Sequence, residues 1–357
     1  MKLLFLSKRR PMGRDLFTRP YGRFYYLPHL LACLGHEVRV LLASYKNDPA
    51  EHLDIRNTVW MSESVYGFGF TRYLKRANGI VQSWKPDWII GLSDTYYGIL
   101  AERLARRCSA RCAIDAYDNY ESYISWLKPL HGLWRDALSR ATLVTAAGPH
   151  LAELLQASRP QGPTVVIPMA ADPIFQPMDK NLAREALKLD LDEKMLGYSG
   201  ALYGNRGIDT LFRAFDLLAA ERPEVKFVLS GRLQKGLALP PNATWLGYVP
   251  DQQMPNVVNS FDGLLVINEL SAFGTYSYPV KLYEAMRCGI PVVASDTPPA
   301  RWILNGDARF LAKPGDPYDL ARKASEMLSE TRRIEYRAQN SWETSAGLFE
   351  SALAAAR

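Results

Sequence analysis

Four stretches of the sequence place charged side chains where an anionic ligand could bind. The first is SYPVKLYEAMRCGIPVVAS at 277–295, in which Lys281 and Glu284 lie on one face of an expected helix. Pro279 suits the first position of that helix, and Gly289 suits the position after its end. At a helix start, exposed N–H groups and the Lys281 ammonium would bind phosphate, while Glu284 would accept hydrogen bonds from sugar hydroxyls. The alternative is a surface ion pair, worth only about 0.3 kcal/mol.

The second stretch, GYSGALYGNRGIDTLFRAF at 197–215, ends a strand at Ser199 and starts a helix near Ile208. Glycines that include Gly200 loosen the turn, and Arg206 adds a fixed positive charge. N–H groups at a helix start favour anions, so this turn is a second candidate phosphate site. A tight turn with a solvated arginine explains the same residues.

The third stretch, AIDAYDNYESY at 113–123, runs from a strand into polar residues, which are Asp115, Tyr117, Asp118 and Glu121. Carboxylates at the carboxyl end of a strand are candidates for catalysis or for binding polar groups. The alternative is turn chemistry, because Asp and Asn also bend chains and cap helices.

The fourth stretch is the loop SKRRPMGRD at 7–15, after the first strand. Gly13 could let the backbone approach a ligand closely. Basic side chains that could attract an anion surround it, namely Lys8, Arg9, Arg10 and Arg14. A basic surface loop without a ligand is the default interpretation.

The elements that must position these side chains alternate between strand and helix. Continuous apolar strands are expected in the first half at KLLFLS, VRVLLA, DWIIGL, RCAID, TLVTAA and TVVIP, and in the second at KMLGYSG, KFVLSG, TWLGYV, DGLLVI and PVVAS. Amphipathic helices are expected between them, at about 21–34, 97–107, from 149, 208–221, 251–259 and 279–288. Such strands and helices indicate parallel sheets covered on both faces. The proline-rich stretch 168–181 is the expected linker.

The predicted fold class is therefore α/β, with two doubly wound Rossmann-like domains at 1–168 and 169–339 that face a central cleft. Helical spacing begins again at about Thr331, and its apolar positions are Trp342, Leu348, Phe349 and Leu353. A C-terminal helix at about 340–357 is expected to pack back on the first domain. In open α/β sheets ligands bind at the carboxyl ends of the strands, which is where the four stretches lie.

The composition excludes several classes of protein. The 357 residues are 48% hydrophobic and 22% charged, which is typical of a globular protein with two domains. No run of 18 apolar residues exists, and the N-terminus does not resemble a signal peptide, so we expect a cytoplasmic protein. The net charge of +6 favours anionic partners, but no uninterrupted basic run predicts nucleic-acid binding. The four cysteines, which form no CxxC pair, are expected to be small core residues.

The order of the motifs resembles that of group 1 glycosyltransferases, glycosyltransferase family 4, which have the GT-B fold. The stretch at 277–295 is similar to the signature of that family. Further stretches follow in family order across nearly the whole chain: MKLLFLS, LPHLLACLGHEVRVLLA, VTAAGPHLAELL, VVIPMAADPIFQP, GYSGALYGNRGIDTLFRAF, FVLSGRLQKG, TWLGYVPDQQMPNVVNSFDGLLVI and GDPYDLARKASEML. The resemblance implies transfer of a sugar from a nucleotide donor with retention of the anomeric configuration.

The resemblance also implies roles for individual residues. The diphosphate-binding lysine of the family falls on Arg206, its arginine falls on Ala201, and Lys281 is expected to supply the missing charge. The ribose-binding glutamate falls on Glu284, and a second family glutamate falls on Tyr276. The implied catalytic residues are Asp118, whose family histidine neighbour is Tyr117 here, together with Arg206 and Lys281. The implied donor-binding residues are Gly13, Gly200, Arg206, Arg232, Gly274 in the SAFG loop, Tyr276, Ser277, Lys281 and Glu284.

The expected partners are a nucleotide-sugar donor, with UDP favoured and GDP as the alternative, and a glycan or lipid-linked acceptor of cell-surface polysaccharide or glycoconjugate synthesis. No cofactor and no metal are expected, because LDLDE at 189–193 is predicted to be a polar turn and not a metal-binding DxD site. The stretch SWLKPLHGLWR at 125–135 could contact the inner face of a membrane, although a capped helix packed in the first domain also explains it.

Three other functions are considered. A sugar-nucleotide 2-epimerase of the same fold and a non-catalytic nucleotide-sugar binder both remain open. An NAD-dependent oxidoreductase is disfavoured, because GFGFTR at 67–72 lacks the third glycine of GxGxxG and follows no clear strand.

Overall fold

The computed structural model describes residues 1–55, 57–203, 207–329, 333–336 and 340–356. The chain divides into two compact units. Unit 1 comprises Met1–Met169 and Ser341–Arg357, and unit 2 comprises Ala170–Asn340. The expected domains were 1–168 and 169–339, so the division falls one residue further along the chain in each case.

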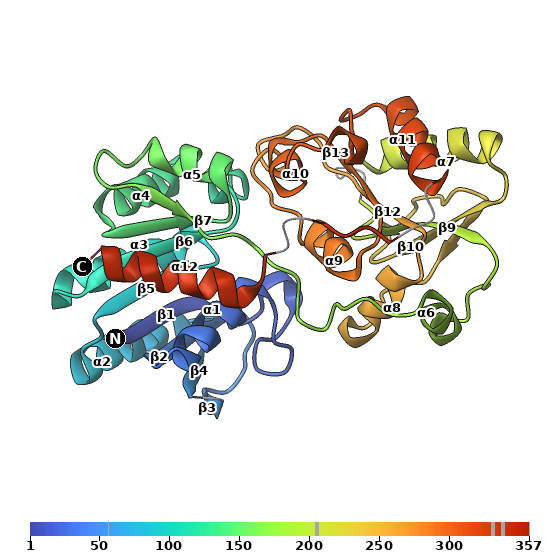
Figure 1. Cartoon of the computed structure of the whole chain (residues 1–357). Helices are drawn as coiled ribbons and strands as arrows, with labels where there is room; N and C mark the ends of the chain where they lie inside the picture. Colours follow the sequence, from blue (N-terminus) through green and yellow to red (C-terminus); the bar gives the residue numbers. More distant parts are fainter. Residues whose placement is uncertain (56, 204–206, 330–332, 337–339, 357) are drawn as a thin grey trace. The chain divides into compact units, whose positions relative to one another are not determined.

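Unit 1 is built on one sheet of eight strands in the order β3-β4-β2-β1-β5-β6-β7-β8. Its strands are β1 (Lys2–Lys8), β2 (Glu37–Ser44), β3 (Glu51–Ile55), β4 (Thr58–Ser64), β5 (Trp88–Leu92), β6 (Arg111–Ala116), β7 (Leu143–Ala146) and β8 (Thr164–Val166). All neighbours pair in parallel except β3, which pairs antiparallel with β4 at the edge. The strands at the centre of the sheet are apolar and buried, as in β5, because helices cover both faces (Figure 1).

The helices of unit 1 are α1 (Gly22–Cys33), α2 (Gly69–Trp84), α3 (Thr95–Cys108), α4 (Lys128–Arg140), α5 (Pro149–Gln156) and α12 (Trp342–Ala355), with short 3-10 turns η1 (Pro11–Gly13) and η2 (Tyr120–Ser122). Three elements between residues 51 and 84 are absent from the sequence-based prediction: β3, β4 and α2. The stretch GFGFTR therefore does follow a strand, β4, which corrects that part of the sequence analysis.

The last helix, α12, packs on α1 of unit 1, and the two lie side by side in Figure 1. Trp342 stacks on Tyr26 with the ring centres 5.5 Å apart, and His36 Nε2 lies 2.9 Å from Glu350 Oε1. The expected helical start near Thr331 is wrong for the residues that can be described, because 333–336 have no regular structure and α12 begins at Trp342. Of the four apolar residues at helical spacing, Trp342, Phe349 and Leu353 are buried and Leu348 is exposed.

Unit 2 has a sheet of six parallel strands in the order β11-β10-β9-β12-β13-β14. The strands are β9 (Lys194–Ser199), β10 (Val225–Ser230), β11 (Ala243–Trp245), β12 (Gly263–Val266), β13 (Val292–Ser295) and β14 (Leu311–Ala312). The helices are α6 (Lys180–Leu187), α7 (Ile208–Glu221), α8 (Met254–Asn259), α9 (Val280–Cys288), α10 (Pro298–Ile303) and α11 (Pro317–Ser329), with 3-10 turns η4 (Asp251–Gln253) and η5 (Ala308–Phe310). In the core, Phe215 of α7 stacks on Phe227 of β10 with ring centres 3.9 Å apart.

Several local predictions need correction. Pro279 precedes α9 as its N-cap residue with extended backbone angles, so the first helical residue is Val280. The expected strand TWLGYV is reduced to the three-residue β11. Of the cysteines, only Cys112 and Cys288 are buried, while Cys33 and Cys108 are exposed. The LDLDE stretch is a turn, as predicted, in which Asp190 accepts the N–H groups of residues 192 and 193.

Candidate functional site

The strand order of unit 2 predicts one ligand-binding crevice at the edge of its sheet. From β9 the chain proceeds outward through β10 and β11, and it then returns to the other side of β9 with β12, β13 and β14. The order reverses between β9 and β12, so the loops that follow these two strands separate there. The described residues between β9 and α7 are 200–203 and 207, and the loop after β12 is 267–279. Both loops contain residues predicted from the sequence.

The loops at this edge approach one another closely. A side chain at Gly231 would place its Cβ 1.9 Å from the carbonyl oxygen of Gly200, so only glycine fits where the loops after β9 and β10 meet. A Cβ at Gly207 would lie 3.4 Å from Cγ of Glu269, which brings the loop after β12 against the start of α7. Gly200 therefore lies in a crowded turn, and Glu269 lies close to Gly207 at the start of α7.

The start of α9 carries the charged pair that the sequence singles out. Lys281 Nζ donates to Glu284 Oε2 at 2.9 Å, so the ion pair forms. Glu284 is only 4% exposed, which is not what a simple surface pair would show. Within the described residues, the second carboxylate oxygen of Glu284 has no hydrogen-bond partner. Pro279 supplies no side-chain cap, so N–H groups at the helix start remain available to an anion.

The SAFG loop before α9 folds tightly on itself. Gly274 N–H donates to Ser271 Oγ at 2.9 Å, and a Cβ at Gly274 would lie 2.0 Å from the carbonyl oxygen of Glu269. Only glycine therefore fits at 274. Tyr276 and Ser277 follow in the same loop and are half-buried. The loop thus places its polar side chains between the end of β12 and the start of α9.

The remaining predicted residues of unit 2 fall at the side of this crevice or outside the described part. Arg232 is exposed after β10, and its guanidinium lies 5.4 Å from the ring centre of Tyr248. Arg206 falls outside the described residues. Ala201, where the family arginine would stand, is half-buried and accepts a hydrogen bond from the Tyr198 hydroxyl at 3.2 Å.

Unit 1 has its own reversal of strand order, between β1 and β5. Gly13 lies in the loop after β1, where it is exposed with a φ of +79°. At the end of β5, the buried Ser93 has a φ of +76°, a strained conformation for a residue with a side chain. Ser93 Oγ accepts the N–H of Lys8 at 3.2 Å, and Asp94 lies 3.8 Å from the Lys8 ammonium. These contacts join the two loops at the reversal point.

Asp118 follows β6, the next strand along the same edge. It is buried, and its Oδ2 accepts the Tyr123 hydroxyl at 2.7 Å. Its neighbour Tyr117, at the family histidine position, packs edge-on against Phe24 with ring centres 5.0 Å apart. Burial raises the pKa of Tyr117, and the charges of Asp118 and Asp94 raise that pKa further. A neutral tyrosine hydroxyl cannot act as a general base in place of a histidine.

Asp115, also considered as a candidate, has a structural role. Arg23 donates to both of its carboxylate oxygens, at 2.8 and 2.5 Å, and both side chains are buried. Thr145 Oγ1 donates to the same carboxylate at 2.6 Å, and Arg23 also reaches the Ile167 carbonyl oxygen at 3.2 Å. Asp115 is thus committed to contacts within the fold, and Asp118 remains the candidate carboxylate of the third stretch.

The basic loop after β1 is largely neutralised within unit 1. Arg9 is buried and pairs with Asp15 at 2.9 Å and with Glu51, while Arg10 pairs with Asp48 at 2.5 Å. These arginines hold the loop in place, which favours the default interpretation of a basic loop without a ligand over attraction of an anion by Arg9 and Arg10.

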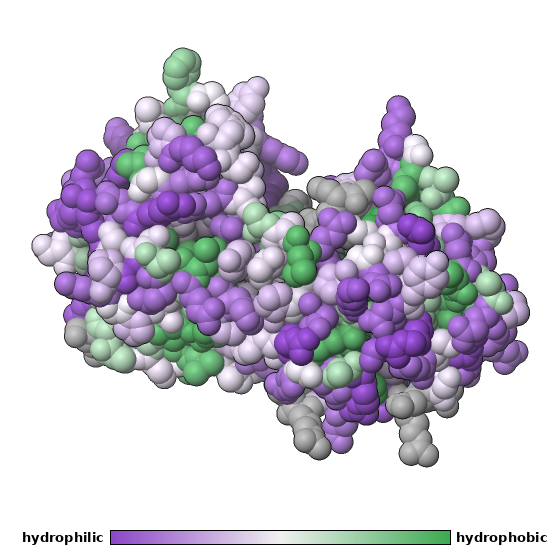
Figure 2. Space-filling view, turned by 90° about the horizontal axis from the view of Figure 1, so that it is seen from above, coloured by the Kyte–Doolittle hydropathy of each residue, from purple (hydrophilic) through white to green (hydrophobic). Residues whose placement is uncertain are grey.

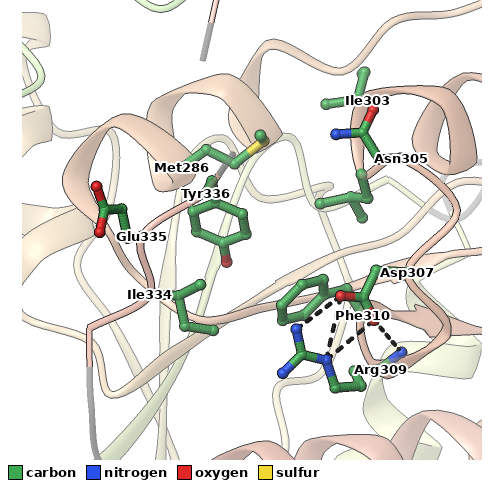
Figure 3. Close-up of a pocket in the computed structure, with 10 residues that line it drawn as sticks. Met286, Ile303, Asn305, Asp307, Arg309, Phe310, Ile334, Glu335 and Tyr336 are labelled. Atoms are coloured by element: carbon green, nitrogen blue, oxygen red, sulfur yellow. Dashed lines mark hydrogen bonds and ion pairs between the residues drawn. The ribbon is translucent and has the colours of Figure 1, made fainter. Parts of the chain in front are cut away.

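Unit 2 also contains a cavity of about 290 Å³, whose lining residues Figure 3 shows. Residues of the segment that enters β14 line it, and there Arg309 donates to Asp307 at 2.8 Å. In a parallel sheet this segment is at the amino ends of the strands, opposite the loops described above. Among the described residues, no group of three or more His, Cys, Asp or Glu side chains is arranged to hold a metal ion. Each helix in the described ranges is too short or too polar to cross a lipid bilayer.

Comparison with known families agrees with this architecture. The sequence model for "Glycosyl transferases group 1" matches residues 179–343, and that for "Glycosyl transferase 4-like domain" matches residues 23–170. The chain belongs to the group 1 glycosyltransferases. The two matches cover most of units 2 and 1, and the family predicted from the sequence is confirmed.

Curated relatives match this glycosyltransferase over part of their length. D-inositol 3-phosphate glycosyltransferase of Thermobispora bispora is 29% identical over 213 residues, which are 54% of this chain and 48% of that protein. The chain thus spans about half or less of the length of the curated relatives that it matches.

Solved structures show that this glycosyltransferase has the GT-B fold, as predicted. Sucrose-phosphate synthase of Thermosynechococcus elongatus superposes with a TM-score of 0.76 at 17% identity, with all of both chains covered. HepE of Anabaena, solved with UDP-glucose, superposes with a TM-score of 0.69 at 17% identity over 98% of this chain and 94% of HepE. At these identities the likeness concerns the fold alone.

Sequence reasoning missed two acidic residues at strand ends of this glycosyltransferase. Glu269 follows β12 and faces the start of α7 across the crevice of unit 2. Asp94 follows β5 and caps α3 by accepting the Thr95 N–H at 2.8 Å. The criterion that selected Asp118, a carboxylate just after an apolar strand, would have found both.

Proposed function

We propose that this glycosyltransferase moves a sugar from a nucleotide-sugar donor to a glycan, glycolipid or lipid-linked acceptor, with retention at the anomeric carbon. UDP-sugars are favoured and GDP-sugars are the alternative. The product would enter cell-surface polysaccharide or glycoconjugate synthesis. The family, the name of the relative and the UDP-glucose in the complex of HepE support this proposal.

The observation that carries the proposal is the buried carboxylate at the start of α9. Glu284 is held by Lys281, and it keeps one oxygen without a partner in the described residues. That oxygen is not fully enclosed by the protein, so it can accept a hydrogen bond from a bound ligand. The ribose of a nucleotide has two hydroxyls, and either can donate a hydrogen bond to this oxygen. The adjoining helix start can then bind the diphosphate.

Positive charge for the departing diphosphate would come from the protein. Lys281 provides a point charge, the start of α9 provides N–H groups and a favourable dipole, and Arg206 is assigned the same role by its family position. Glu269 lies beside the start of α7 and would accept hydrogen bonds from the transferred sugar. We infer that transfer does not require a metal ion.

Unit 1 would bind the acceptor at the edge formed by the loops after β1, β5 and β6. Asp118 is its candidate catalytic residue, because it is a buried carboxylate at the end of β6 held by the Tyr123 hydroxyl. A carboxylate fixed in this way can orient an acceptor hydroxyl or stabilise positive charge that develops at the anomeric carbon.

A panel of nucleotide sugars tests the proposal. A ligand at a hundred times its dissociation constant adds about 2.7 kcal/mol to the free energy of unfolding, which a thermal-shift assay detects readily. The sugar nucleotide that stabilises the protein is then incubated with and without candidate acceptors, and the nucleoside diphosphate and the product are followed by NMR. Acceptor-dependent release with a retained anomer is expected. Epimerisation of the donor sugar without any acceptor would instead identify the 2-epimerase activity.

A further inference from the structure

Unit 1 contains an apolar groove that the proposed function does not use. Over the face seen in Figure 2, hydrophobic residues form separate patches among hydrophilic ones, as on most proteins. The groove differs because it is a cavity of about 600 Å³ between α2 and α3, within the ~300–1,000 Å³ range of small-molecule sites. Leu74 of α2, Ile99 and Leu100 of α3, and Leu130 and Leu133 of α4 line it.

One end of the groove is positively charged. The charged residues in its lining are Arg103 and Arg107, which lie one turn apart near the end of α3 and are exposed. Neither arginine forms an ion pair with any described residue, and no carboxylate lines the groove. The neighbouring Arg106, in contrast, lies 3.5 Å from Glu102. Two unpaired guanidinium groups at the end of an apolar channel suit a phosphate group.

The other end of the groove is aromatic and lies near the carboxyl edge of the sheet, where α2 and α3 begin. Phe70 and Tyr96 line it and are also exposed. Phe68, in the turn just before α2, is 96% exposed, which is unusual for a phenylalanine in water. Aromatic side chains of this kind are typical of the boundary between water and a membrane.

We propose that this groove binds one hydrocarbon chain of an anionic phospholipid, whose phosphate lies on Arg103 and Arg107. The chain would lie along α3 toward Tyr96, a distance of about 10 Å at 1.5 Å per residue. Phe68 and Phe70 would enter the outer part of the bilayer at that end. This proposal concerns attachment to a membrane and does not depend on the donor or the acceptor of the reaction.

The charge pattern favours a phospholipid over other occupants. A free phosphate ion would use the arginines but would leave the apolar walls exposed. A second copy of the chain would have to bring acidic groups to one end of the groove and apolar groups to the other. An anionic phospholipid has both features in one molecule, in the order that the groove presents them.

Vesicle co-sedimentation of the full chain tests the proposal, with vesicles of phosphatidylcholine alone and of phosphatidylcholine mixed with phosphatidylglycerol. Two variants address the site: Arg103→Glu with Arg107→Glu removes the phosphate contacts, and Leu100→Trp fills the groove without changing the charge. The matched control is Arg72→Glu with Lys75→Glu, which makes the same change in net charge on α2 outside the groove. Thermal denaturation of each variant verifies that it folds.

We expect binding to the mixed vesicles only, with affinity reduced about tenfold or more in both groove variants and much less in the control. Monomeric lysophosphatidylglycerol should protect the wild type against thermal unfolding, whereas glycerol phosphate and monoacylglycerol should not. Equal losses in the control and in the arginine variant would reduce the effect to general electrostatics and overturn the proposal. Protection by glycerol phosphate alone, or a dimer that Leu100→Trp abolishes, would overturn it in favour of an anion site or a self-association surface.

Discussion

Replacing Lys281 with methionine removes the ammonium group while keeping most of the length of the side chain. In the structure this ammonium donates to Glu284 at 2.9 Å, and the lysine side chain is 29% exposed. A hydrogen bond to a charged group contributes about 1.5–3 kcal/mol. If the same ammonium also contacts the diphosphate of the donor, we expect its loss to weaken nucleotide binding by about 10- to 100-fold.

The same substitution leaves the buried Glu284 carboxylate without its lysine, so a decrease in the free energy of unfolding is also expected. Isothermal titration with UDP and with UDP-sugars measures the loss of nucleotide affinity. Thermal denaturation of the free protein measures the loss of stability, so the two effects can be separated. The double variant Lys281→Met with Glu284→Gln removes the unpaired charge and should recover stability without recovering affinity. A Lys281→Met protein that is less stable but binds nucleotide as tightly as the wild type would refute the phosphate role and leave only the ion pair.

Three further outcomes are expected. Glu284→Ala should weaken binding of UDP much more than binding of pyrophosphate, and equal losses for the two ligands in titration calorimetry would show that Glu284 does not contact the ribose. Asp118→Asn should lower the turnover number far more than donor affinity, since Asp118 lies in unit 1; turnover like that of the wild type would return Asp118 to a turn role. Transfer should continue in EDTA, because fixed positive charge and helix starts stabilise the diphosphate; activity that EDTA abolishes and Mg²⁺ or Mn²⁺ restores would contradict this.

The buried strands and the helices between them could be predicted because their sequences are unambiguous. Strand β5, for example, is a continuous apolar run buried on both faces. The edge strand β3 was missed because three of its five residues are exposed and its sequence, EHLDI, has no continuous apolar run. Strand β11 forms over only three residues of the longer stretch expected, since pairing with β10 extends no further.

For the site, local sequence indicated which loops matter but not how each carboxylate is used. The partner of Asp115 is Arg23, which lies 92 residues away in the sequence, so no local pattern could show that this carboxylate is already paired. The Lys281–Glu284 pair was predictable from helical spacing, but the burial of Glu284 depends on how α9 packs in unit 2. Spacing thus gives neighbours within an element, whereas burial and long-range pairing require the fold.

The return of α12 to unit 1 affects how the protein can be made. Unit 1 is discontinuous in sequence, and its last helix follows the whole of unit 2 along the chain. During synthesis, the surface of α1 that includes Tyr26 would stay uncovered until the ribosome has translated Trp342 and the residues after it. Unit 2 can complete its own contacts earlier, although it is encoded later than most of unit 1. The N-terminal unit is therefore the last to be completed, and in the meantime a chaperone could bind its open apolar surface.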